Sequence, residues 1–289
     1  MEYVKEHSYK SGTPTMGGIA IILAMLTAAL IFGKGKFVYI TLAVAFAYGV
    51  TGFLDDSIKI RYKRNLGLRP YQKIILQLSI ALIVAFVVYK NELIRGDVYI
   101  PFTKNTVSLG WGVIPLVVFI FIATTNSVNL TDGLDGLAAS TTLVYMAGIA
   151  AIIAIVAADA DKNGLSLYVK EYQGLLTVCF ATVGSLAGFL LFNCFPAKIF
   201  MGDVGSLALG GVVACVSILG RLSLYIPILG VMFATSAVSD IIQVVHYKRT
   251  KRRVFLMAPF HHHLQKKGLS ETRIGFLYST ITGIVALIC

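Results

Sequence analysis

The chain has 289 residues, of which 57% belong to the hydrophobic set and only 13% are charged, and its mean hydropathy is +0.80. About a quarter of the residues of a soluble domain are charged, so this composition excludes an ordinary soluble protein. The formal net charge of +11 favours anionic partners, either lipid head groups or an anionic substrate. A nucleic-acid partner is not expected.

The apolar residues form nine continuous blocks, and most are long enough to cross a hydrocarbon core, which takes roughly 20 residues. In chain order the blocks are Gly17–Gly33, Phe37–Leu54, Tyr71–Tyr89, Val113–Thr125, Leu134–Ala157, Gly174–Phe192, Val204–Gly220, Leu222–Val245 and Ile274–Cys289. The fourth is short and counts as a span only if its helix extends into residues 126–130. The sequence therefore predicts an all-α polytopic membrane protein with about nine transmembrane helices, in one integral-membrane domain covering residues 1–289.

The basic residues of the connecting segments predict the orientation in the membrane. If the nine spans cross the membrane in turn, seventeen of the 25 Lys and Arg residues lie on the side of the N-terminus and eight on the other side. The positive-inside rule then puts the N-terminus in the cytoplasm and the C-terminus outside. In the outer loop Leu93–Leu109, two β-prone runs flank "TKN" and predict a short β-hairpin.

Five polar stretches interrupt or precede the apolar blocks, and on this topology all of them open to the cytoplasm. In chain order they are "SGTPTMGG" (Ser11–Gly18), "GFLDDSIKIRYKRNLGL" (Gly52–Leu68), "NSVNLTDGLDGLA" (Asn126–Ala138), "FNCFPAKIFMGDVGSLALGG" (Phe192–Gly211) and "KRTKRRVFLMAPFHHHLQKKG" (Lys248–Gly268). Since each carries groups with chemical use, their shared side predicts one functional site at the cytoplasmic surface.

The carboxylates of these stretches predict a divalent-cation site. Asp55 and Asp56 are adjacent at the inner end of a span and are expected on different sides of their helix. Asp132 and Asp135 are three residues apart, close enough to share a helix face, and Asp203 stands where a span begins. Any one of them has a plainer interpretation as a helix cap or a loop acid. As a set, carboxylates repel unless a cation joins them, and oxygen ligands alone favour Mg²⁺ or Mn²⁺ over Zn²⁺.

Glycines and lysines near these acids extend the prediction to phosphate chemistry. Glycine lets the backbone approach a ligand closely, and Gly133 is one of several that flank the acids. Lys59, Lys63 and Lys73 surround the same face and are expected to balance a polyphosphate. Carboxylates, Mg²⁺, glycine loops and lysines are together the components of phosphoryl transfer.

The run of three histidines, His261, His262 and His263, leaves alternatives open. A zinc site needs spaced ligands, whereas consecutive side chains cannot all point at one ion. The remaining interpretations are an amphipathic loop without chemistry and contact with an anionic diphosphate by one or two of the rings. We favour the second of these. His261 is expected to contact the substrate, and His262 and His263, as candidate catalytic residues, are expected to contact the phosphates or to position the loop.

These stretches together resemble the phospho-N-acetylmuramoyl-pentapeptide transferase family, within the wider polyprenyl-phosphate N-acetylhexosamine-1-phosphate transferase superfamily. The match runs from Gly12 to His263 and is carried by "GTPTMGG", "GFLDD", "NLTDGLDGLA", "FNCFPAKIFMGDVGSLALGG" and "MAPFHHH". The resemblance implies transfer of phospho-MurNAc-pentapeptide from UDP-MurNAc-pentapeptide to undecaprenyl phosphate. The implied products are lipid I and UMP, with Mg²⁺ as cofactor, at the cytoplasmic face of a bacterial cell membrane. The lipid bilayer and a second copy of the chain are further candidate partners.

The resemblance also implies roles for individual residues. It makes Asp203 the Mg²⁺ ligand and Asp55 and Asp56 catalytic acids, one of them a candidate base for the lipid phosphate. It assigns the nucleotide site to a set that comprises Asn129, Asp132, Gly133, Asp135, Asn193 and Phe200. We favour direct attack by the lipid phosphate over a covalent enzyme intermediate, since a phosphate oxygen is already anionic.

Three departures from the family pattern are visible. The family has ten spans with one before "GTPTMGG", whereas only sixteen residues precede the first block here. The family's usual Glu is replaced by Ser236, with an acid four residues later at Asp240, and Gln265 follows the histidines where Glu is usual. The alternatives to the muramoyl activity are a GlcNAc-1-phosphate transferase and a transporter. A transporter is disfavoured because the acids lie at the inner ends of spans rather than at the bilayer midplane.

Overall fold

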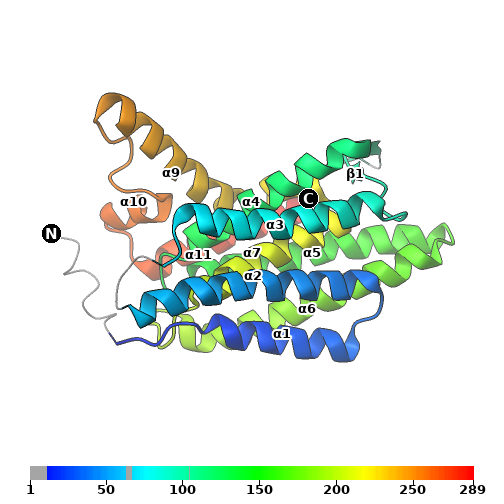
Figure 1. Cartoon of the computed structure of the whole chain (residues 1–289), viewed down its shortest axis with the longest axis horizontal. Helices are drawn as coiled ribbons and strands as arrows, with labels where there is room; N and C mark the ends of the chain where they lie inside the picture. The colour runs from blue at the N-terminus through cyan, green and yellow to red at the C-terminus, as the bar shows by residue number, and fades with distance from the viewer. Residues whose placement is uncertain (1–11, 63–66, 104) are drawn as a thin grey trace.

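The computed structural model describes residues 12–62, 67–103 and 105–289, and most of them lie in helices (Figure 1). The α-helices are α1 (Gly18–Phe32), α2 (Lys36–Arg61), α3 (Pro70–Lys90), α4 (Val113–Thr131), α5 (Leu137–Lys162), α6 (Ser166–Asn193), α7 (Gly202–Leu219), α8 (Ile226–Leu229), α9 (Val231–Thr250), α10 (Phe260–Lys266) and α11 (Glu271–Ile288). Two 3₁₀ turns, η3 (Gly110–Gly112) and η4 (Ser223–Tyr225), and two strands, β1 (Asp97–Tyr99) and β2 (Thr106–Ser108), complete the described elements.

All nine predicted apolar blocks are helical, and the all-α membrane fold is confirmed. The short fourth block does extend, because α4 continues to Thr131. Among the described residues, six helices are long and apolar enough to cross a membrane, or seven if η4–α8 and α9 count as one bent span. Two of the nine predicted blocks, α1 and α11, do not qualify as membrane spans by length and hydropathy. Helix α1 has only 15 residues, and the first turn of α11 holds the charged Glu271 and Arg273.

Helix α7 forms the centre of the bundle. Its residues from Val204 to Leu219 are all buried, and α1, α2, α4 and α5 pack against it. A helix that is apolar on every side is expected in such a position, since no face has to meet water. The outer helices instead expose large apolar side chains such as Phe46, Ile83 and Phe180, as a lipid-facing surface requires.

The eighth predicted span is not straight. The segment Ser223–Leu229 and helix α9 meet at Gly230 with a bend of 77°, and α9 leans away from the bundle (Figure 1). The expectation of one continuous helix over Leu222–Val245 is therefore wrong. A glycine at the break leaves the backbone free of side-chain restraint, which local hydropathy does not report.

The predicted β-hairpin is confirmed as the antiparallel pair β1–β2, in which Val98 faces Val107. The Arg221 carbonyl accepts a hydrogen bond of 2.8 Å from the Tyr99 backbone N–H. The Arg221 guanidinium pairs with Asp97 at 3.1 Å and lies 5.0 Å above the Tyr99 ring. The segment between α7 and η4 thus anchors the hairpin to the bundle.

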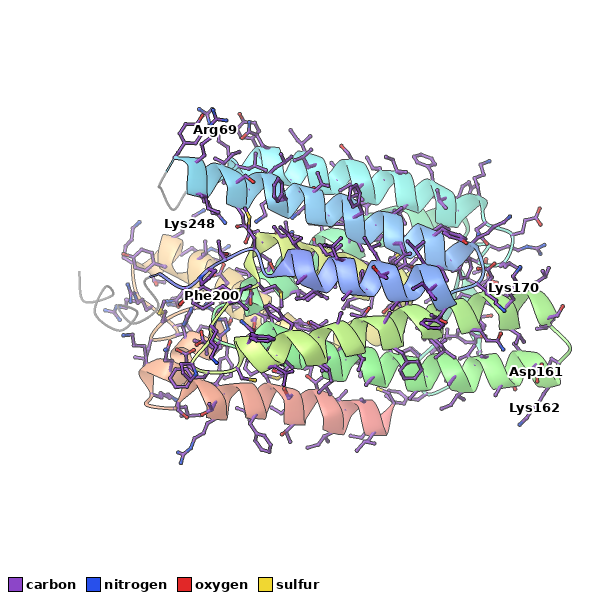
Figure 2. The ribbon with its side chains drawn as sticks, turned by 90° about the horizontal axis from the view of Figure 1, so that it is seen from below. Arg69, Asp161, Lys162, Lys170, Phe200 and Lys248 are labelled. Carbon is purple, nitrogen blue, oxygen red and sulfur yellow. The ribbon has the colours of Figure 1, made fainter. Side chains whose placement is uncertain are left out.

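Charged side chains gather at the two ends of the bundle. Figure 2 shows Arg69, Lys248 and Phe200 at one end, and Lys162 and Lys170 at the other. The first is called the α10 end and the second the hairpin end. The sorting of basic residues by sequence separated the same residues, so the bundle has the two-sided charge arrangement of a membrane protein.

Candidate active site

The site begins with a close approach of α2 to the start of α7. A Cβ atom added to Gly52 would lie 2.5 Å from the backbone nitrogen of Val204 and closer still to the Asp203 carbonyl. Only glycine fits this contact, which places the last turns of α2 directly against the N-terminus of α7. As a result, Asp55 and Asp56 meet an acid almost 150 residues away in the sequence.

Asp55, Asp56 and Asp203 form one carboxylate cluster, with an oxygen from each lying within 4.8 Å of the others. The Asp56 carboxylate accepts a hydrogen bond of 3.2 Å from the Val204 N–H, which belongs to the first turn of α7. The Asp55 carboxylate accepts one of 2.9 Å from the Leu68 N–H. The two adjacent acids do turn toward different segments, as expected from their helix, yet both retain an oxygen beside Asp203.

Two lysines neutralise most of this negative charge. Lys59 Nζ lies 2.6 Å from Asp55, 3.5 Å from Asp56 and 3.0 Å from Asp203. Lys73 Nζ lies 2.8 Å from Asp203. The third predicted lysine, Lys63, lies outside the described residues. Three carboxylates against two ammonium groups leave one negative charge, which is consistent with an additional cation.

Oxygen ligands of this kind fit a hard divalent cation such as Mg²⁺. An ammonium group already stands among the three carboxylates, which shows that the geometry accepts a positive charge at their centre. The other oxygen of Asp203 accepts a hydrogen bond of 2.8 Å from the Asn129 side-chain amide, which also donates to the Ser206 hydroxyl. Asn129 therefore orients the carboxylate that the resemblance makes the metal ligand.

The cluster opens into a cavity of about 510 Å³ at the α10 end. Its described lining comprises Thr15, Asp56, Lys59, Ile60, Asn129, Asp132, Gly133, Leu134, Asp135, Asn193, Phe200, Gly202, Asp203 and His262. Ten of these are residues that the sequence analysis had selected. It had not selected Thr15, Ile60, Leu134 or Gly202 as site residues, although Thr15, Leu134 and Gly202 lie within motifs quoted for the resemblance.

Asp132 and Asp135 do not share a helix face, and that expectation is wrong. Helix α4 ends at Thr131 and α5 begins at Leu137, so both acids lie in the turn between them. Gly136 takes a φ of +71° in this turn, a backbone conformation that side chains disfavour. Spacing in the sequence resembles a helical repeat here, but the glycines at 133 and 136 end it.

Hydrogen bonds between side chains and the backbone hold this turn beside the loop that leads to α7. The Asp135 carboxylate accepts from the Ala197 N–H at 2.9 Å. Asn193 accepts from the Gly136 N–H at 3.1 Å and donates to the Ile199 carbonyl at 2.8 Å. Both side chains line the cavity and also connect its two walls.

One acid in this arrangement was missed by the sequence analysis. Glu271 lies in the first turn of α11 and is buried, and its carboxylate accepts a hydrogen bond of 3.0 Å from the Asp135 N–H. An acid after the Ser270 helix cap resembles an ordinary first-turn residue. Nothing in the local sequence indicates its distant partner.

The three histidines occupy three different environments. His261 is fully buried, its ring lies where a Cβ of Gly133 would be, and burial lowers its pKa to about 3. It does not line the cavity among the described residues, so the predicted substrate contact by His261 is not supported. The ring of His262 does line the cavity, with Nδ1 3.1 Å from the Gln265 side-chain oxygen.

His263 contacts the segment that precedes α10 and holds it in place. Its Nδ1 accepts a hydrogen bond of 3.1 Å from the Leu256 N–H, and its ring packs against Phe255 and Phe260. Of the two roles expected for it, contact with phosphates or positioning of the loop, this geometry supports the second.

Neither Ser236 nor Asp240 is among the described residues that line the cavity. Ser236 is fully buried, and its hydroxyl lies 3.4 Å from that of Tyr278. Asp240, the acid four residues later on α9, therefore does not replace a cavity acid.

Comparison with known proteins assigns this site to a family. A sequence model described as glycosyl transferase family 4 matches residues 37–221, and one described as phospho-N-acetylmuramoyl-pentapeptide-transferase signature 1 matches residues 10–22. The chain is 42% identical over 286 residues to the phospho-N-acetylmuramoyl-pentapeptide-transferase of Clostridium novyi (strain NT), covering 98% of this chain and 84% of that protein. The chain belongs to the phospho-N-acetylmuramoyl-pentapeptide-transferase family.

Other members of the phospho-N-acetylmuramoyl-pentapeptide-transferase family are as similar. The protein of that name from Clostridium botulinum (strain Alaska E43 / Type E3) is 44% identical over 290 residues, with 98% of this chain and 83% of that protein covered. The one from Bacillus mycoides (strain KBAB4) is 43% identical over 289 residues, with 98% and 85% covered. The region matched by the glycosyl transferase family 4 model contains the whole carboxylate cluster, and the signature contains Thr15.

Proposed function

We propose that the protein transfers phospho-MurNAc-pentapeptide from UDP-MurNAc-pentapeptide to undecaprenyl phosphate, giving lipid I and UMP. The observation that carries this proposal is the cluster of Asp55, Asp56 and Asp203 with Lys59 and Lys73 at the base of the cavity. A transferase of this kind has to bring a diphosphate and a phosphate together, and such a cluster supplies cation sites and ammonium groups for both.

The position of the cluster supports a reaction between a soluble donor and a membrane lipid. It lies at the α10 end, where α2 finishes and α7 starts, at the boundary between the apolar bundle and its charged end. A nucleotide arrives there from water, while the phosphate of a polyprenyl lipid stays at the same depth and its tail remains in the bilayer. The excess of basic residues at this end supports its placement on the cytoplasmic face of a bacterial cell membrane.

Mg²⁺ is the proposed cofactor, with Asp203 as its ligand beside Asp55 and Asp56. When bound, the ion would offset negative charge on the donor diphosphate and on the departing UMP. Lys73 and Asn129 hold the Asp203 carboxylate in place. His262, on the cavity wall, is positioned to contact a phosphate group.

We propose direct transfer in this cavity. An oxygen of the lipid phosphate forms a bond to the sugar-linked phosphorus of the donor, and the bond from that phosphorus to the UMP oxygen breaks. Asp55 or Asp56 orients the acceptor and takes its proton if the phosphate arrives as a monoanion. The turn at residues 132–136 and the loop before α7 hold the uridine part of the donor.

The test is a UMP-release assay with purified protein and undecaprenyl phosphate, run in parallel with UDP-MurNAc-pentapeptide and UDP-GlcNAc. Release with the muramoyl donor alone is expected, and release with UDP-GlcNAc alone would refute the proposal in favour of the GlcNAc-1-phosphate activity. Direct transfer is tested separately by incubating Asp55→Asn and Asp56→Asn proteins with radiolabelled donor but no acceptor. A trapped phospho-enzyme in either would contradict it.

A further inference from the structure

Lys59 occupies a position that a divalent cation would also need. Its ammonium group is within ion-pair distance of Asp55, Asp56 and Asp203, the three carboxylates that offer oxygens to an ion. Magnesium binds carboxylate oxygens directly, at about 2.0–2.1 Å, and tolerates little distortion of its coordination shell. An ammonium group and a metal ion therefore cannot use these oxygens together in the arrangement that the structure shows.

The hydrogen bonds of Asp203 show which groups compete with a cation for its oxygens. One of its oxygens accepts from Lys59 at 3.0 Å and from Lys73 at 2.8 Å, while the other accepts from Asn129 at 2.8 Å. Each oxygen thus already has a strong donor. These three donors take up three of the carboxylate's roughly four lone-pair positions, and the oxygen that shares Lys59 with Asp55 and Asp56 accepts from both lysines. A cation that joins the three acids at this oxygen has to displace one of the two lysines.

Lys59 is the donor best able to withdraw. Its side chain is 32% exposed and lines the cavity, whereas that of Lys73 is 18% exposed and is not among the described lining residues. Lys59 contacts all three acids, so it also receives the greatest repulsion when a divalent cation enters. The cavity of about 510 Å³ beside it gives the ammonium group a place to move.

We propose that Lys59 is a displaceable counter-ion of the carboxylate cluster. Without a divalent cation, its ammonium group holds Asp55, Asp56 and Asp203 together. Entry of the cation moves the ammonium group into the cavity, toward the walls formed by Gly133 and His262, where an anionic substrate group would meet it. The same side chain thereby links cation binding to anion binding. This inference rests on the proposed divalent-cation requirement.

The test measures Mn²⁺ binding without substrate, by the loss of the free-ion electron paramagnetic resonance signal, in detergent-purified protein. Lys59→Met and Lys59→Gln remove the competing charge and are expected to bind Mn²⁺ about tenfold or more tightly than the unaltered protein, because a like charge beside the ion is removed. Lys59→Arg keeps that charge and should show no such gain. Two independent neutral variants guard against one that fails to fold, which size-exclusion chromatography would reveal.

A second readout is thermal stability. Without divalent cations, the neutral variants are expected to melt at a lower temperature than the unaltered protein, because three carboxylates, two of them buried, lose a partner. Added Mn²⁺ should raise their melting temperature more than that of the unaltered protein. Equal or weaker Mn²⁺ binding by Lys59→Met and Lys59→Gln would overturn this inference but not the proposed cation requirement. Mn²⁺ binding by none of the proteins would overturn the inference together with the proposed cation requirement.

Discussion

The contact between Gly52 and the start of α7 provides the sharpest test of how the fold builds the site. In Gly52→Ala, the new methyl group would lie 2.5 Å from the Val204 nitrogen, whereas ordinary van der Waals contact begins at 3.4 Å. The obstructing atoms belong to the backbone and cannot rotate away. Helices α2 and α7 therefore have to separate by about 1 Å, at the turn that holds Asp55 and Asp56 against Asp203.

Two opposing effects determine the stability of this variant. Alanine favours a helix over glycine by about 1 kcal/mol, while overpacking of this kind typically costs about 1–3 kcal/mol. The net loss of stability is thus expected to be about 0–2 kcal/mol, and the protein should remain folded. Activity is far more sensitive, because a misplacement of about 1 Å among reacting groups lowers a rate by about 100-fold.

The assay is UMP release at saturating donor, together with the melting temperature of the same preparation. Gly184→Ala in α6 is the matched control, since no heavy atom of the described residues lies within 4 Å of the added methyl group. It should keep full activity and lose no stability. Activity in Gly52→Ala within about threefold of the control would refute the argument that this contact sets the geometry of the cluster.

Three further predictions concern residues around the cavity. Asn129→Ala removes a donor to Asp203 and should weaken Mn²⁺ binding by about tenfold or more, as measured by titration, with unchanged binding contradicting the orienting role. Glu271→Ala leaves the buried Asp135 N–H without its acceptor, so stability should fall by about 1–3 kcal/mol and the KM for the nucleotide donor should rise. Burial lowers the pKa of His261 from 6.5 to about 3, so its neutral form is favoured in the folded protein. The stability it contributes is complete above pH 6.5 and declines as the pH falls toward 3. In His261→Phe, the melting temperature should therefore depend less on pH over that range, and an unchanged pH dependence would contradict this.

Much of the architecture could be predicted from the sequence because it depends on local chemistry. Continuous apolar blocks predicted the long helices of the bundle, since a segment in lipid has to satisfy its own backbone hydrogen bonds. They did not predict the break at Gly230 or the short helix α10. Alternating β-prone residues around "TKN" predicted the hairpin that Val98 and Val107 pair across. The chemistry of the site was also visible, because acids, glycines and lysines are out of place between apolar blocks.

The tertiary structure alone decided how those groups meet. Whether Asp55 and Asp56 reach Asp203 depends on the fit of Gly52 against another helix, which no local pattern records. The environments of the three histidines, with one ring buried, one on the cavity wall and one bracing a loop, follow from what α10 packs against. The partnership of Glu271 with Asp135 likewise joins residues 136 positions apart. Local sequence determines which segments become helices, whereas side-chain roles arise from contacts between distant segments, and these form only when the helices pack.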